Sequence, residues 1–170
     1  MKLVGSQLSL KGRALRLLSG REYSRHELER RLAIYEELPG ELAKILEELQ
    51  GKGFISEHRV VESVINRRSA KLGASRIRQE LQAKGLDREV VTEAVARLQS
   101  TELARARLLW EKKFANQAGG AYDPGQPAPG QPLDRAAIAS KRGKQIRYLA
   151  SRGFSGDTIR RVLQGGGGEE

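Results

Sequence analysis

The sequence predicts an all-α protein made of three tandem three-helix repeats, and two observations lead to this. Apolar residues recur at helical spacing almost throughout, as Leu42, Leu46 and Leu49 illustrate, and no segment alternates long enough to indicate a strand. The chain also matches itself when it is shifted by 49 residues and again by 68 residues. Since one helical unit of this size buries little surface alone, we expect neighbouring repeats to cover one another in an elongated, curved array.

The first repeat is expected to span residues 8–55. Its helices are predicted at 8–19, 24–34 and 39–51. Ser24 and Glu27 have the spacing of a capping box, in which each side chain binds a backbone N–H at the helix start. Pro39 suits the first position of the third helix, and Gly53 is expected to terminate that helix.

The second repeat is expected to span residues 56–100. Its helices are predicted at 57–72, 74–84 and 87–99. The 49-residue shift places Leu28 on Ile77 and Leu32 on Leu81, so the apolar positions of the two repeats coincide. Asp87 is expected to cap the last of these helices.

The third repeat is expected to span residues 101–164, with a Pro/Gly-rich insertion at 116–133. Its helices are predicted at 101–115, 135–151 and 155–164. The 68-residue shift places Gly85 on Gly153, and Ser155 then follows as an N-cap. The insertion holds four of the five prolines and is expected to be mobile, and residues 165–170 are expected to form a disordered tail.

The composition argues against catalysis and against a membrane protein. There is no cysteine, and the two histidines, His26 and His58, have no ligand or relay partner at helical spacing, so we expect no metal, no cofactor and no catalytic set. No phosphate-binding glycine motif and no apolar run of membrane-spanning length are present. We therefore expect a cytoplasmic protein that is not an enzyme.

The basic residues carry the functional signal, because the formal net charge is +10. They are densest in the second and third repeats, which suggests binding to an acidic partner, nucleic acid first. The candidate binding residues are Arg67, Arg68, Lys71, Arg76, Arg78, Lys84, Lys141, Arg142, Lys144, Arg147, Arg152, Arg160 and Arg161. Arg67 and Lys71 are expected to be like-charged neighbours on one helix. The alternative is an ordinary solvated face, and in the first repeat Arg25, Arg30 and Arg31 are interleaved with glutamates.

Three segments in order resemble the bacterial RecX family. The first is Ser24-Arg-His-Glu-Leu-Glu-Arg-Arg-Leu, and the second is Gly73-Ala-Ser-Arg-Ile-Arg-Gln-Glu-Leu-Gln-Ala-Lys-Gly. The third, which contains Arg152-Gly-Phe-Ser, lies near the end of the chain. The resemblance covers roughly residues 8–164 apart from the insertion. It departs from the family at Ser56, where an acidic residue is common, and in the length of the insertion.

The resemblance implies a regulatory protein of homologous recombination, DNA repair and the SOS response. Members of that family bind the RecA recombinase along the groove of its filament on DNA and restrain ATP hydrolysis, filament extension and strand exchange. For this chain we expect a monomer that contacts RecA and, more weakly, DNA, with the basic residues neutralising acids or phosphates. The alternatives are a DNA-binding or architectural protein that acts without a recombinase, and a helical scaffold for another partner.

Overall fold

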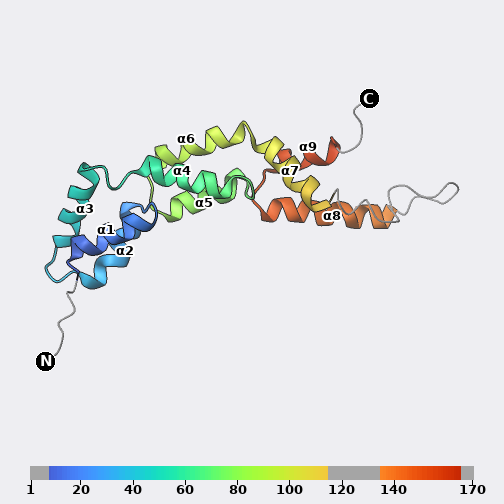
Figure 1. Cartoon of the computed structure of the whole chain (residues 1–170). Coiled ribbons are helices and arrows are strands. Elements are labelled where there is room, and N and C mark those ends of the chain that lie inside the picture. Colours follow the sequence, from blue (N-terminus) through green and yellow to red (C-terminus); the bar gives the residue numbers. More distant parts are fainter. Residues whose placement is uncertain (1–7, 115–134, 166–170) are drawn as a thin grey trace. The chain divides into compact units, whose positions relative to one another are not determined.

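The computed structural model describes residues 8–114 and 135–165, and within them every regular element is helical (Figure 1). The helices are α1 (Leu10–Gly20), α2 (Arg25–Leu32), the 3₁₀ helix η1 (Ala33–Tyr35), α3 (Glu41–Gly51), α4 (Glu57–Arg68), α5 (Ala74–Ala83), α6 (Arg88–Gln99), α7 (Glu102–Phe114), α8 (Arg135–Ser151) and α9 (Gly156–Gln164). The predicted all-α class is thereby confirmed. The insertion predicted at 116–133 and residues 166–170 of the predicted tail lie outside the described residues.

Local sequence signals set most of these helix ends. Ser24 accepts the N–H of Glu27, and its own N–H donates to the Glu27 carboxylate, so the predicted capping box is present. Ser155 and Asp87 each accept a backbone N–H at the start of α9 and α6, at 3.2 and 2.7 Å. Gly53 adopts a positive φ of 75° after α3, a conformation that glycine reaches without steric cost.

Several predicted helix boundaries differ from the structure by two residues or more, and two of the differences have a clear local cause. α3 begins at Glu41 rather than at Pro39, because Gly40 turns the chain with a φ of 86° and the Glu36 carboxylate accepts the N–H groups of Gly40 and Leu42. α4 ends at Arg68 rather than near residue 72, because the N–H of Lys71 turns back to the Arg68 carbonyl. Arg67 and Lys71 are therefore not neighbours on one helix face.

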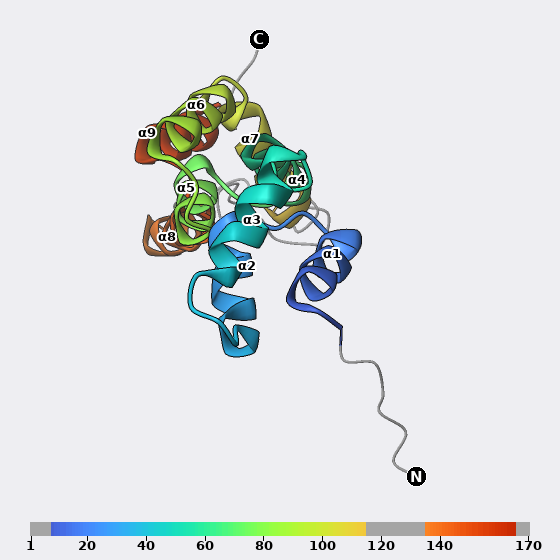
Figure 2. The ribbon, with the colours of Figure 1, turned by 90° about the vertical axis from the view of Figure 1, so that its left-hand side faces the viewer.

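The described residues divide into two compact units. Unit 1 contains residues 8–65 and 80–92, and unit 2 contains residues 66–79 and 93–165. In unit 1, α1, α2 and α3 pack against one another (Figure 2). Leu28, Leu46 and Leu49 are fully buried there and form the centre of the core.

In unit 2, α7, α8 and α9 form a second three-helix cluster. Its core contains Ala106, Leu149 and Val162, which are at most 1% exposed. Figure 1 shows the first turns of α8 extending beyond α7 and α9. Most side chains at the start of α8, including that of Arg135, are exposed.

Each unit contains one version of the same contact between a helix start and a glycine turn. In unit 1 the Ser24 hydroxyl donates to the carbonyl of Lys84, and in unit 2 the N–H of Gly73 donates to the carbonyl of Arg152 at 2.9 Å. The shifts of 49 and 68 residues place Ser24 on Gly73 and Lys84 on Arg152. The internal repetition of the sequence thus corresponds to a repeated contact between a helix start and a glycine turn, made by the Ser24 side chain in unit 1 and by the Gly73 backbone in unit 2.

Candidate basic interface

Positive charge is concentrated in one of the two units. The described residues of unit 1 contain 12 basic and 13 acidic side chains, which gives a formal charge of −1. Those of unit 2 contain 18 basic and four acidic side chains, which gives +14. The net charge of the whole protein therefore describes neither unit, and any strong attraction to a polyanion comes from unit 2.

Twelve of the thirteen candidate residues lie in unit 2, and the exception is Lys84. The Lys84 ammonium pairs with Glu27 at 2.8 Å, and its side chain is only 12% exposed. Burial of Glu27 opposes its ionisation, but hydrogen bonds from Arg21, Lys84 and the Ser24 backbone outweigh this and lower the Glu27 pKa to about 2. Lys84 therefore takes part in holding the glycine turn against α2.

The helix α8 carries basic residues without any acidic ones. Its 17 residues include Arg135, Lys141, Arg142, Lys144 and Arg147, all of them exposed, and no Asp or Glu. Gln145 and Leu149 face the core, four residues apart, and anchor the C-terminal half. A helix that carries five cations and no Asp or Glu of its own is well suited to lie along a chain of phosphates or acidic side chains.

The segment from α4 to α5 brings five more candidates to unit 2, namely Arg67, Arg68, Lys71, Arg76 and Arg78, all exposed. The Arg76 guanidinium donates to the carbonyl of Ser151 at 3.3 Å, and its side chain packs where a Cβ on Gly153 would be. Arg76 therefore has a structural contact in addition to its charge. In α9, Arg160 pairs with Asp157 at 3.3 Å, whereas Arg161 is exposed.

A groove of about 780 Å³ in unit 2 collects basic and apolar side chains. Its lining includes two predicted residues, Lys71 and Arg152, and three that the sequence analysis did not single out, Arg105, Lys112 and Lys113. Leu108, which is 67% exposed, and Tyr148 supply its apolar surface. The sequence marks Lys112 and Lys113 only as a pair of adjacent basic residues near the end of the helix predicted at 101–115.

Arg105, a part-buried residue of the lining, shapes this groove. Its guanidinium donates to the carbonyls of Ser69 and Leu72, each at 2.8 Å, and to that of Leu98 at 3.0 Å. Burial lowers the pKa of Arg105, and the nearby Glu102 carboxylate partly offsets this effect. Arg105 thus fixes the turn that places Lys71 at the groove.

Nothing in the described ranges, 8–114 and 135–165, offers a metal centre, because no group of three or more His, Asp or Glu side chains comes together there. His58 approaches Glu62 at 3.9 Å, and His26 lies against Gly85. Nor is any helix in those ranges long and apolar enough to cross a bilayer.

Comparison with known protein families relates two parts of the chain to one family. Residues 56–95 match a domain described as "RecX, second three-helix domain". Residues 135–163 match "RecX, third three-helix domain".

Curated relatives match the chain over nearly its whole length. A protein named "Regulatory protein RecX" from Leptothrix cholodnii is 46% identical over 158 residues, which is 93% of this chain and 89% of the relative. A protein of the same name from Ralstonia nicotianae is 39% identical over 165 residues, covering 97% of this chain and 92% of the relative.

The fold is also that of a solved structure. The crystal structure of RecX from Lactobacillus salivarius superposes with a TM-score of 0.71, at 21% identity, and the match covers 92% of this chain and 93% of that one. At this identity the match supports the three-helix-repeat fold alone.

Proposed function

Because the chain belongs to the RecX family of regulatory proteins, we propose that it binds the RecA–DNA filament along its groove and restrains ATP hydrolysis, filament extension and strand exchange. It acts in the cytoplasm, as a monomer and without catalysis of its own. Unit 2 makes the principal contact, and DNA is touched directly but more weakly than the filament.

The observation that carries this proposal is the charge of +14 on unit 2 beside −1 on unit 1. A filament of protein on DNA presents phosphates and acidic side chains over a long distance. Cations that neutralise phosphates release condensed counterions, so binding through unit 2 falls steeply as salt rises. Unit 1, which is almost neutral, contributes little to that salt dependence.

Inhibition then follows from occupancy of the groove. A protein seated there contacts neighbouring recombinase protomers at once, and linked weak contacts gain affinity through effective concentration. While it is bound, it opposes the rearrangement of protomers that accompanies ATP hydrolysis, and it covers the path of a second DNA strand.

The test reverses two exposed charges on α8, in the double variant Lys144→Glu and Arg147→Glu. The control reverses two exposed charges of unit 1, Arg30→Glu and Lys44→Glu, so both variants change the net charge equally. Co-sedimentation with RecA filaments on DNA is measured across salt concentrations together with ATP turnover.

We expect the α8 variant to lose filament binding and ATPase inhibition and to show a shallower salt dependence, by roughly one unit of log–log slope for each phosphate contact removed. The control should retain most of its binding. Equal loss in both variants, or intact inhibition in the α8 variant, would contradict the proposed surface. Measuring affinity for DNA without recombinase in the same salt series tests the alternative, since a stand-alone DNA-binding protein would bind DNA as tightly as filaments.

A further inference from the structure

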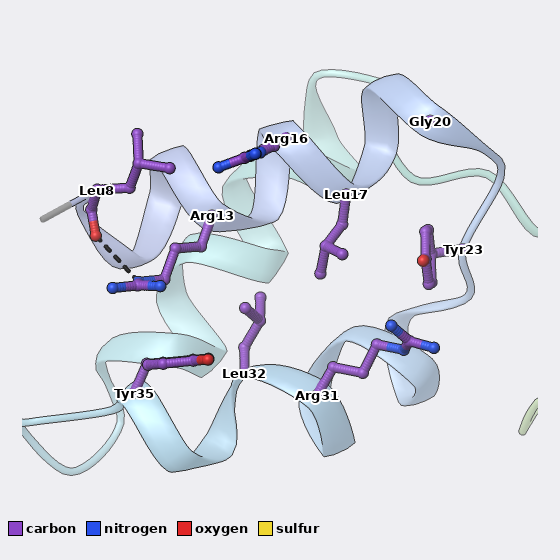
Figure 3. Close-up of a pocket in the computed structure, with 9 residues that line it drawn as sticks. All are labelled: Leu8, Arg13, Arg16, Leu17, Gly20, Tyr23, Arg31, Leu32 and Tyr35. Atoms are coloured by element: carbon purple, nitrogen blue, oxygen red, sulfur yellow. Dashed lines mark hydrogen bonds between the residues drawn. The ribbon is translucent and has the colours of Figure 1, made fainter.

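Unit 1 contains a pocket that the proposed function does not use. It lies between α1 and the α2–η1 segment and has a volume of about 450 Å³ (Figure 3). None of its lining residues belongs to the basic interface of unit 2.

Arginine side chains lie near two tyrosine rings, at opposite sides of this pocket. The Arg13 guanidinium lies 4.1 Å from the centre of the Tyr35 ring, and its Nε donates to the Leu8 carbonyl at 3.1 Å. On the other side the Tyr23 ring is covered by the Arg21 guanidinium, 3.5 Å from its centre, and the Arg31 guanidinium lies 5.4 Å from the same point. Figure 3 shows the side chains of Leu17 and Leu32 pointing toward one another between these two rings.

The charged side chains that line the pocket are all basic. Its lining contains Arg13, Arg16 and Arg31 and no acidic residue. Among the described residues, neither Arg16 nor Arg31 forms an ion pair with a carboxylate, and both are exposed. Three arginines and no carboxylate in the lining of one pocket point to an anionic ligand.

We propose that this pocket binds one nucleotide. Arg16 and Arg31 contact the phosphate through guanidinium N–H groups, which match phosphate oxygens in pairs. The base, which is flat and apolar on both faces, lies against Leu17 and the exposed part of the Tyr35 ring. A volume of about 450 Å³ is within the usual range for a small-molecule site.

The surface next to the pocket is acidic, and this limits the length of the ligand on that side to a single nucleotide. A second hollow of about 400 Å³ shares Leu8, Arg13 and Tyr35 with the pocket, and it is lined by Glu36, Glu37 and Glu41. These carboxylates would repel a second phosphate. The nucleotide is therefore either a free nucleoside phosphate or the terminal residue of a single strand.

The experiment compares two double variants of the full chain. The first, Arg16→Gln with Arg31→Gln, removes the two exposed pocket arginines. The control, Arg30→Gln with Lys44→Gln, removes two exposed charges from the same unit outside the pocket. ATP and a short oligothymidylate are the two probes, measured by calorimetry and fluorescence anisotropy.

We expect the pocket variant to bind at least one probe tenfold or more weakly than the control. Tyr35, whose side chain is partly exposed, supplies the stacking test: Tyr35→Phe should retain binding, and Tyr35→Leu should weaken it about fivefold or more. Binding of ATP identifies a free nucleotide as the ligand, and binding of the oligonucleotide alone identifies a strand end.

The proposal is overturned if neither probe binds. It is also overturned if the control loses as much binding as the pocket variant, or if Tyr35→Leu binds as well as the wild type. The inference is separable from the proposed regulatory function. The α8 variant Lys144→Glu/Arg147→Glu should retain nucleotide binding even where it loses the filament, because those side chains lie outside the pocket.

Discussion

Replacing Gly73 by alanine tests the repeated contact between a helix start and a glycine turn in unit 2. A Cβ at Gly73 would overlap the carbonyl oxygen of Gly153 and the amide nitrogen of Phe154. Both are backbone atoms, so no side-chain rotation relieves the overlap. Gly73 does not adopt a positive φ, so the effect of the substitution is steric rather than conformational.

The magnitude follows from what the methyl group displaces. To admit it, the start of α5 must move away from the turn, which breaks the hydrogen bonds from Gly73 N–H to Arg152 and from Ser75 N–H to Gly153. Each bond contributes about 1 kcal/mol, and residual overpacking adds about 1–3 kcal/mol. We therefore expect a loss of about 3–5 kcal/mol, a large part of the stability of a small unit.

Trp110 provides the assay, because it is the sole tryptophan of the chain and lies in unit 2. Urea unfolding followed by its fluorescence should show a lower midpoint for Gly73→Ala. Gly156→Ala is the matched control, because a Cβ there meets nothing within 4 Å, and it should be neutral or slightly stabilising. A midpoint for Gly73→Ala equal to that of the control would refute the reasoning.

Two further predictions concern carboxylates that accept several hydrogen bonds. Glu102 is 5% exposed and accepts the Ala74 N–H and the Thr158 hydroxyl, both at 2.9 Å, so Glu102→Ala should destabilise unit 2 by about 2–4 kcal/mol and Glu102→Gln by less. Urea unfolding followed by Trp110 fluorescence measures both variants, and an Ala variant as stable as the Gln variant would contradict it. Since the folded pKa of Glu27 is lowered to about 2 from an ordinary 4.5, its contribution to stability is present above about pH 5 and is lost as pH falls toward 2. Circular dichroism across that range should show this loss in the wild type and a flatter profile in Glu27→Gln.

Much of the fold could be predicted because its signals are local. Ser24, Asp87 and Ser155 cap helices through their own nearest backbone groups, and Gly53 ends one by adopting a φ that other residues avoid. The prediction that α3 begins at Pro39 was wrong, because the Glu36 carboxylate caps the helix from across a turn. A side chain that caps a helix across several residues of irregular backbone has no characteristic distance in sequence from the helix start, so this cap could not be predicted.

The candidate interface was predictable only in part. The exposed cations of α8 could be found from their density alone. Arg105, Lys112 and Lys113 could not, because each belongs to the groove only after α7 has packed against α8 and α9 and after Arg105 has engaged the turn at residues 69–72. The pocket arginines of unit 1 were hidden for a similar reason, since Arg13 and Arg16 lie in a different helix from Arg31 and meet it only in the fold.

The amino-acid sequence by itself determined the helices, their repetition and the excess of positive charge. These properties depend on residues a few positions apart, or on composition. The tertiary structure decided how the charge is distributed. Contiguous segments carry modest excesses throughout, whereas the units are assembled from discontinuous segments and carry −1 and +14. The physical reason is that the boundaries between the two units fall inside α4, α5 and α6. Residues that are adjacent in the sequence therefore belong to different units, and each unit's charge depends on which segments pack together.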